Sequence, residues 1–287
     1  MKHSYARYRR GAGHLSRRAW QAVRIAAAVS VVVAGAGLAA APHASAAGLS
    51  PVPVTAFQAN GSGDLWFDGP KGYFDTGLGM APGTSPSIAA QSNGDYEVAF
   101  QANGSRDLWF DGSKGYFDTG LAMAPGTSPS ITAVNSGYEI AYQSSSHLLG
   151  YTGIAGSALT GLAMDPASSP SITTTASFNF GPENFQIAFE SSTDVLGTTG
   201  VFGTESLGLD MAPGTSPSTS GLLTLGLIPG NPFFTAVDIG YHIDFHASTG
   251  TLCTYDFNGS WLGGIYTSNG NTGYGMAAGA SPSTSGS

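Results

Sequence analysis

The chain has 287 residues, of which 10% are charged and 42 are glycine, and its formal net charge at pH 7 is −8. Seven of its ten Lys and Arg residues precede Ala46, so the rest of the chain carries three basic residues against 18 acidic ones, a formal net charge of −15. A surface this acidic repels phosphate backbones and anionic lipid headgroups, which disfavours nucleic-acid binding and membrane-surface binding.

Residues 1–46 have the features of an export signal. A basic leader ending at Arg24 precedes the apolar run Ile25–Ala41, and Ala44-Ser45-Ala46 supplies the small residues of a cleavage site. The apolar run is too short and too rich in Gly and Ala for a lasting membrane span. We therefore expect a signal peptide cleaved after Ala46 and a secreted mature chain with no membrane insertion. Arg17-Arg18 also fits a twin-arginine signal, so Sec and Tat export both stay open.

The rest of the chain is built from repeats. Met80-Ala81-Pro82-Gly83-Thr84-Ser85-Pro86-Ser87 returns in related form from Met123, Met164, Met211 and Met276, at spacings of 43, 41, 47 and 65 residues. A strand-like phrase such as Glu97–Gln101 follows four of these runs. A period of about 40 to 50 residues made of short strands is typical of β-propeller blades.

One repeat reads as four strands. The expected strands are 128–133 (innermost), 97–101 (second), 107–111 (third) and 116–121 (fourth), each named in its clearest copy. Pro129 suits an edge strand because proline has no N–H to donate. One glycine of the fourth strand recurs in all five copies, which indicates a positive φ or a close backbone approach, at Gly77, Gly120, Gly161, Gly208 and Gly273.

The two ends of the chain complement each other. The first repeat lacks an innermost strand, whereas the chain stops at Ser281-Pro282-Ser283-Thr284, an innermost strand with nothing after it. We therefore predict an all-β fold: residues 47–287 form one five-bladed β-propeller of four-stranded blades, and its ring is closed by the C-terminal strand. The blades are expected at roughly 54–80, 85–123, 128–164, 169–211 and 216–287, with 281–287 completing the first blade.

These repeat phrases resemble a known family. Gly-Met-Ala-Pro-Gly-Thr-Ser-Pro-Ser-Ile, Tyr-Glu-Val-Ala-Phe-Gln-Ala-Asn and Asp-Leu-Trp are similar to the repeats of secreted bacterial PLL-like propellers, which are related in architecture to the tachylectin and tectonin lectins. The resemblance runs from about Val54 to Ser283. It implies a lectin-like protein that binds sugars in shallow pockets between adjacent blades. The Asp-Leu-Trp phrase survives only in the first two repeats, so the implied sites are unequal.

The first two repeats contain the side chains that sugar binding needs. A sugar ring requires a flat apolar surface for its C–H face, and carboxylates or amides for its hydroxyls. The candidate sugar-binding residues are Gln58, Asn60, Asp64, Trp66, Asp68 and Tyr73 in the first repeat, and Gln101, Asn103, Asp107, Trp109, Asp111 and Tyr116 in the second. Packing between blades is the alternative role for the two Trp, because their column is expected to continue as Leu149, Leu196 and Cys253.

Metal and catalytic sites are not expected. His242, Asp244 and His246 alternate on one strand face in a way that could hold a metal, but the same positions recur with ordinary residues in other repeats. Asp64 and Asp68 lie in an apolar strand and not in a calcium-binding loop. The chain has no G-x-S-x-G motif and one cysteine, Cys253. We predict no metal, no cofactor and no enzymatic activity.

The sequence thus predicts a secreted carbohydrate-binding protein whose partners are glycans, with its strongest sites on the faces or in the clefts of blades one and two. The alternative is a non-catalytic extracellular protein-interaction scaffold. That alternative would use the Leu222–Gly240 insertion between the first two strands of the last blade.

Overall fold

The computed structural model describes residues 55–69, 72–91, 94–134, 137–175, 185–227, 235–260 and 264–283, and in these ranges the regular secondary structure is entirely β. The signal peptide predicted for residues 1–46 lies outside them. Leu49–Ser287 forms one compact unit. Among the residues described, no helix is long and apolar enough to span a membrane.

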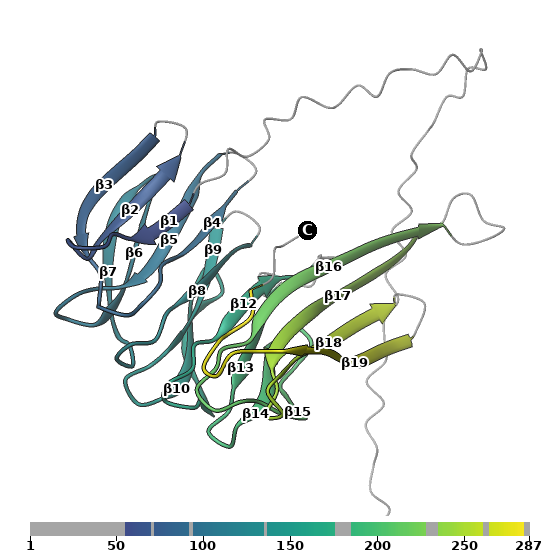
Figure 1. Ribbon diagram of the computed structural model, residues 1–287. Helices are drawn as coiled ribbons and strands as arrows, with labels where there is room; N and C mark the ends of the chain where they lie inside the picture. Colours follow the sequence, from purple (N-terminus) through teal and green to yellow (C-terminus); the bar gives the residue numbers. More distant parts are fainter. Residues whose placement is uncertain are drawn as a thin grey trace, which may run out of the picture. The chain divides into compact units, whose positions relative to one another are not determined.

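In the described ranges nineteen strands form five antiparallel sheets, which follow the order of the chain (Figure 1). Sheet one contains β1 (Thr55–Gln58), β2 (Asp64–Gly69) and β3 (Gly72–Gly79). Sheet two contains β4 (Ser87–Ala90), β5 (Tyr96–Gln101), β6 (Asp107–Gly112) and β7 (Gly115–Ala122). Sheet three contains β8 (Ser130–Val134), β9 (Gly137–Gln143), β10 (Leu148–Gly153) and β11 (Gly156–Ala163). Sheet four contains β12 (Ser171–Thr174), β13 (Phe185–Glu190), β14 (Val195–Gly200) and β15 (Glu205–Asp210), and sheet five contains β16 (Ser218–Leu227), β17 (Thr235–His246), β18 (Thr251–Ser260) and β19 (Gly264–Gly275).

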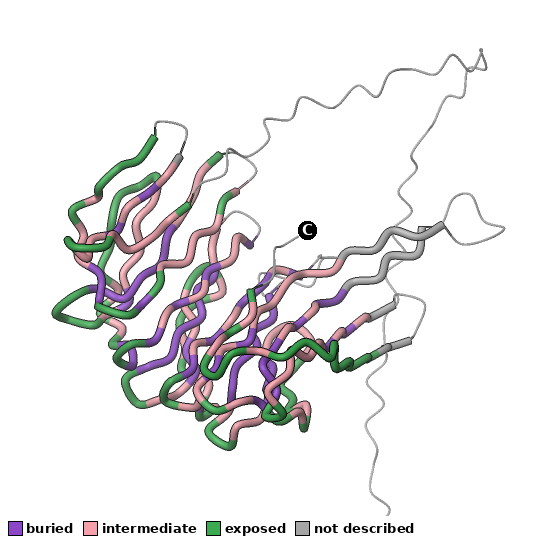
Figure 2. The backbone as a smooth tube through the Cα atoms, viewed as in Figure 1, coloured by how far each residue is buried: buried purple, intermediate pink, exposed green. Residues whose placement is uncertain are grey.

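The predicted division of a repeat into four strands is confirmed. In sheets two to five each strand pairs with the next along the chain, and the bounds of β5 to β8 lie within two residues of the predicted ones. The fourth strand of the repeat is the most exposed, and large apolar side chains in it, such as Phe117 in β7, are more than half exposed (Figure 2). The buried side chains therefore come mainly from the second and third strands.

Neighbouring sheets share their cores. Alternate residues of a third strand pack against the second strand of the next sheet, as Leu65 and Phe67 do against Val98 and Phe100. The same arrangement joins Leu108 to Ile140 and Tyr142, Leu149 to Ile187 and Phe189, and Leu196 to Ile243 and Phe245. Full burial of one such side chain contributes about 1.5–3 kcal/mol. Contacts between sheets are therefore a major source of stability.

Two columns of serine hydroxyls tie the sheets together. In the first column the amide N–H of one Ser-Pro-Ser run donates to the leading serine of the next, in the order Ser85, Ser128, Ser169, Ser216 and Ser281, at 2.8–2.9 Å. In the second column amide N–H groups donate in the opposite direction along the chain, to Ser87, Ser130 and Ser171, at 3.0–3.1 Å. The innermost strands also line a hollow of ≈ 470 Å³. The Ser-Pro-Ser motif thus supplies serine hydroxyls that accept hydrogen bonds between sheets, and its proline leaves no unpaired backbone N–H at the edge of the strand.

The recurring glycine of the fourth strand has a positive φ in every copy. Its φ is 67° at Gly77, 66° at Gly120, 78° at Gly161, 66° at Gly208 and 76° at Gly273. A Cβ added at any of these positions would meet nothing within 4 Å, so backbone conformation and not crowding requires the glycine. The strand pairing shifts register beside this residue, as between Asp107 and Trp109, which is a β-bulge.

Ring closure is not seen among the described residues. Sheet one has three strands, and Ser281–Ser283 forms none. Residues 284–287, part of the predicted closing strand, lie outside the described ranges. The Ser281 hydroxyl nevertheless continues the serine column by accepting from the Ser216 N–H.

The Leu222–Gly240 insertion lengthens two strands. β16 and β17 pair without interruption from Ser218 opposite Asp244 to Leu227 opposite Thr235. In Figure 1 this hairpin reaches beyond the ends of β18 and β19 in its own sheet. The tip, residues 228–234, is not described. The insertion is therefore an extended β-hairpin on the last sheet.

Candidate functional site

The Asp-x-Trp-x-Asp phrases occupy β2 and β6, where alternation places their three side chains on one face of each strand. Trp109 packs against the core shared by sheets one and two, so this face of sheet two is turned toward sheet one. Trp66 lies on the opposite face of β2 from Leu65 and Phe67, which pack against sheet two. The two tryptophans therefore have different surroundings despite their matching sequence.

Sheet two holds a stacked aromatic pair. The rings of Trp109 and Tyr116 lie 6.0 Å apart and only 7° from parallel, and Phe100 supports the indole from β5 at 6.3 Å. Tyr116 is 64% exposed, whereas the Trp109 Nε1 atom is buried and has no hydrogen-bond partner in the described structure. The half-buried indole thus supports the tyrosine ring, and the tyrosine is the ring exposed to solvent.

Sheet one arranges the same residues differently. The Phe57 ring lies 6.4 Å from the rings of both Trp66 and Tyr73, and it meets Tyr73 edge-on. Tyr73 is 71% exposed, and the Trp66 Nε1 atom is buried without a described partner. Sheet one therefore exposes a tyrosine but does not seat it flat on the tryptophan.

Carboxylates flank the aromatic pair of sheet two. Asp111 lies opposite Tyr116 in the strand register, and Asp118 lies opposite Trp109, so both share the face of the stacked rings. Burial raises the pKa of Asp111, and a hydrogen bond from the Gly112 backbone opposes that rise. Asp107, Asp64 and Asp68 are all half-buried. The expected combination of aromatic ring and carboxylate is thus present on this face of sheet two.

The four predicted amide residues divide into two groups. Gln101 is fully buried, and its amide N–H donates to the Ala124 carbonyl at 2.9 Å. Gln58 likewise donates to the Met80 and Ala81 carbonyls at 3.1 and 3.2 Å. Asn60 and Asn103 are exposed in the hairpin turns. The glutamines therefore hold the Met-Ala-Pro-Gly turns in place, and the structure does not bring them to the exposed rings.

The predicted continuation of the tryptophan column was wrong by one residue in two sheets. Trp109 pairs with Phe100, and the corresponding pairs are Gly150 with Tyr142 and Gly197 with Phe189. Leu149 and Leu196 instead match the buried Leu108, whereas Cys253 is correctly aligned opposite Phe245. A Cβ on Gly150 or Gly197 would come within 2.6 Å of the neighbouring aromatic ring, so that ring fills the space of the missing side chain.

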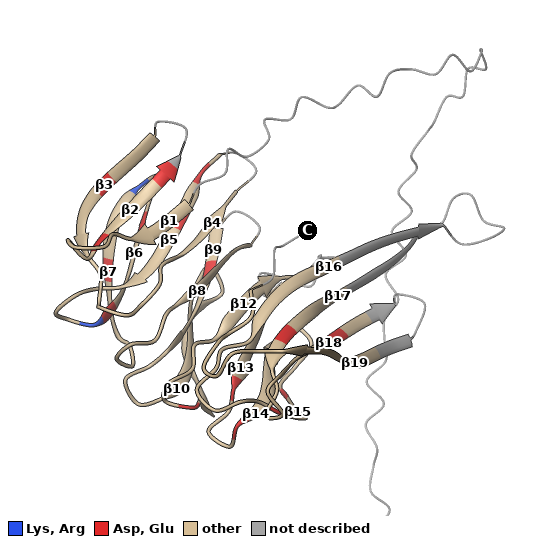
Figure 3. Cartoon of the chain, viewed as in Figure 1, with Lys and Arg blue, Asp and Glu red and all other residues tan. Residues whose placement is uncertain are grey.

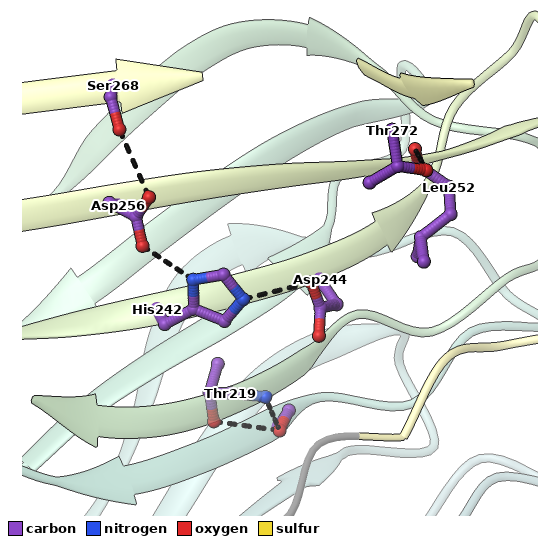
Figure 4. Close-up of polar contacts among 8 residues, drawn as sticks. Thr219, His242, Asp244, Leu252, Asp256, Ser268 and Thr272 are labelled. Atoms are coloured by element: carbon purple, nitrogen blue, oxygen red, sulfur yellow. Dashed lines mark hydrogen bonds and ion pairs between the residues drawn. The ribbon is translucent and has the colours of Figure 1, made fainter. Parts of the chain in front are cut away.

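The structure separates the histidine trio of β17. His242 lies between Asp244, at 2.9 Å, and Asp256, and Ser268 donates to the second oxygen of Asp256 (Figure 4). Burial alone would lower the pKa of His242, but the hydrogen bonds and charges of Asp256 and Asp244 outweigh burial and raise it. His246 is buried elsewhere, with Nδ1 3.0 Å from the Ala280 carbonyl oxygen. His242 therefore belongs to a hydrogen-bonded network with two aspartates, whereas His246 makes a separate contact with a turn.

Three acids that were not among the predicted site residues meet where the turn after β11 approaches the connection between β13 and β14. Asp165, Glu190 and Asp194 each offer an oxygen, and these oxygens lie within 4.8 Å of one another. The available signal was the column Gln58, Gln101, Gln143, in which the fourth copy is Glu190.

No protein-family model and no curated protein sequence matches the chain. Among solved structures it is similar to the SapL1 lectin in complex with alpha methyl fucoside, at 13% identity and a TM-score of 0.44, covering 78% of this chain and 83% of that one. It is also similar to a mutant of the Aleuria aurantia lectin AAL in complex with Fucalpha1-6GlcNAc, at 13% identity, a TM-score of 0.46 and 80% coverage of each chain. A third similar structure is BBS1N in complex with ARL6DN, at 12% identity and a TM-score of 0.41, covering 79% of this chain and 72% of that one.

Proposed function

We propose that the protein is a secreted, non-catalytic carbohydrate-binding module of the β-propeller type, whose main site is the face of sheet two that carries Trp109, Tyr116 and Asp111. The observation that carries this proposal is the parallel stack of a 64% exposed Tyr116 on a half-buried Trp109. Such a pair offers a flat, immobilised ring to the C–H face of a sugar.

The neighbouring acids supply the polar half of the site. Asp111 and Asp118 share the face of the stacked rings, and ionised carboxylates accept strong hydrogen bonds from sugar hydroxyls. Sheet one would contribute a weaker second site through Tyr73, which lacks the parallel stack. Two shallow sites of about 1 mM each gain strength mainly on multivalent glycans.

The proposed protein is a closed ring in which the C-terminal residues complete sheet one. The continuation of the serine column to Ser281 supports this closure, and so does the finding that sheet one has only three strands among the described residues. Export by the leader that ends at Ala46 places the ring outside the cell.

A glycan array probed with the exported form, residues 47–287, tests the proposed function. We expect binding to a restricted set of glycans that grows with the density of printed sugar. Failure on every glycan, microbial and methylated sugars included, would contradict the proposal and favour an interaction scaffold that uses the β16–β17 hairpin.

A further inference from the structure

The residue at the end of the second strand has a recurring structural role in several sheets. In the first three sheets a glutamine amide donates to a turn carbonyl: Gln58 to Ala81 at 3.2 Å, Gln101 to Ala124 at 2.9 Å and Gln143 to Asp165 at 2.7 Å. In sheet five His246 Nδ1 lies 3.0 Å from the carbonyl oxygen of Ala280, three residues further along the turn than Ala277, the counterpart of Ala124. A hydrogen donor is therefore the chemical requirement at this position.

Glu190 occupies the position in sheet four and has no such donor when ionised. Its side chain is fully buried, and neither carboxylate oxygen has a hydrogen-bond partner in the described structure. The backbone N–H groups of Gly214 and Thr215 approach closely enough to lower its pKa, but they do not reach hydrogen-bond geometry. A buried carboxylate left in this state is costly unless a proton or a cation accompanies it.

A second acid faces Glu190 where another sheet has a complementary partner. In sheet three His147 Nδ1 lies 3.3 Å from the Gln143 side-chain oxygen. The residue equivalent to His147 in sheet four is Asp194, which shares its left-handed backbone, with φ of 58° at both. Sheet four thus replaces a glutamine–histidine pair with two carboxyl groups.

A third acid comes from the preceding turn. The Asp165 N–H donates to the Glu190 carbonyl at 3.1 Å, as the Ala124 N–H does to Gln143 at 2.9 Å. The corresponding turns after sheets one, two, four and five all have alanine at this position, namely Ala81, Ala124, Ala212 and Ala277. The only turn with an acid here is the one that lies beside Glu190.

No lysine or arginine from the third, fourth or fifth repeat is available to balance the charge of the three acids. The only Lys and Arg residues after Ala46 are Lys71, Arg106 and Lys114, all from the first two repeats. In Figure 3 the blue segments accordingly occur only among the strands of sheets one and two. Burial, followed by the charges of Asp165 and Asp194, raises the pKa of Glu190 to about 8.

We propose that Asp165, Glu190 and Asp194 form a binding site for Ca²⁺ at the junction of sheets three and four. The donors are all oxygens, which suit this hard cation. Two oxygens bound to one Ca²⁺ at about 2.4 Å can lie up to about 4.8 Å apart, and the three side chains meet that limit. The smaller Mg²⁺ demands near-ideal octahedral geometry and usually keeps several waters, so a site built from three protein carboxylates suits it less well. The site is separate from the sugar-binding face of sheet two.

Thermal unfolding in a calcium titration tests the site. The protein is first treated with EGTA, and its melting temperature is then followed as CaCl₂ or MgCl₂ is added. We expect the melting temperature to rise with calcium concentration, because only the folded chain assembles the three acids, and to respond less to magnesium. Isothermal titration calorimetry measures the binding directly.

Two variants locate the effect. Glu190→Gln restores the glutamine of the other sheets, so it should fold at least as stably without calcium but lose the calcium-dependent shift. Glu205→Gln removes an exposed acid from the same sheet and should keep the full shift. No calcium response in the unaltered protein, or an undiminished response in Glu190→Gln, would overturn the proposal. Glu190 would then be a buried protonated carboxyl that replaces glutamine as a donor.

Discussion

Glu190 makes the stability of the calcium-free protein depend on pH. Its pKa is raised to about 8, chiefly by burial, so the folded chain retains a proton that the unfolded chain has released. The stabilising contribution of that proton is complete below the ordinary glutamate pKa and is lost as pH rises through about 8. The pKa of His242 is also raised, and its contribution is likewise lost with rising pH.

Comparison with Glu190→Gln isolates the glutamate from His242. We predict that urea unfolding in EGTA, measured from pH 5 to pH 9, shows a smaller loss of stability with pH for Glu190→Gln than for the unaltered protein. The difference between the two proteins should be largest at the alkaline end. If the free energy of unfolding changed equally with pH in both proteins, the ionisation of Glu190 would not destabilise the fold.

A single residue in a repeat is predictable only when the repeats are aligned in the correct register. Trp66 and Trp109 lie in nearly identical copies, so their strands were assigned correctly. In the diverged copies Leu149, which precedes a glycine, was aligned with Trp109 because both are apolar, although Gly150 is the true counterpart of Trp109. The space beside such a glycine is filled by an aromatic ring from the neighbouring strand, such as Tyr142. The sequence of the strand that contains the glycine therefore does not reveal the packing.

At the scale of the element, the fourth-strand bulge depends on its glycine. Gly120 has a φ of 66°, a conformation that costs an L-residue about 1–2 kcal/mol. We predict that Gly120→Ala destabilises the fold by about that amount in urea unfolding. Gly275→Ala is the matched control, because Gly275 lies at the end of another fourth strand in open space without a positive φ. An equal loss in both variants would argue against the conformational explanation.

The serine columns should contribute measurably to the contact between sheets. The Ser171 hydroxyl accepts from the Thr219 N–H at 3.0 Å and lies 2.9 Å from the Thr219 hydroxyl. We predict that Ser171→Ala costs about 1–3 kcal/mol, because it leaves a partly buried N–H without its acceptor. Ser192→Ala, at an exposed turn, should change stability by less than about 0.5 kcal/mol. Equal melting temperatures for the two variants would show that the serine column does not stabilise the contact between sheets.

The strand pattern was predictable, whereas the serine columns were not. Short strands alternate at period 2 and are bounded by Gly, Asn and Ser, and this pattern identifies them in any copy. Proline in Ser-Pro-Ser indicates an edge strand. Nothing local, however, reveals that Ser85 and Ser128, 43 residues apart, are joined through a hydroxyl. The role of Gln101 was missed for a similar reason, since its partner Ala124 lies 23 residues away.

At the scale of the whole molecule, ring closure can be tested by two truncations. Removing residues 280–287 deletes the carbonyl that contacts His246 and the hydroxyl that accepts from Ser216, so the melting temperature should fall. Removing only 284–287 keeps both contacts. If the C-terminal residues complete sheet one, the shorter truncation should also lower the melting temperature. An unchanged melt after the shorter truncation would indicate that these residues do not close the ring.

We propose that sugar binding is concentrated on the stacked aromatic face of sheet two. The most direct test of this claim is the affinity of three variants for the best glycan from the array: Tyr116→Ala, Tyr73→Ala and Tyr274→Ala. All three remove an exposed outer-strand tyrosine, at 64%, 71% and 73% exposure, but only Tyr116 stacks flat on a tryptophan. We predict a loss of about tenfold or more for Tyr116→Ala, equivalent to about 1.4 kcal/mol, a smaller loss for Tyr73→Ala and none for Tyr274→Ala, with native circular dichroism throughout. Unchanged binding by Tyr116→Ala, or equal losses in all three variants, would contradict the claim.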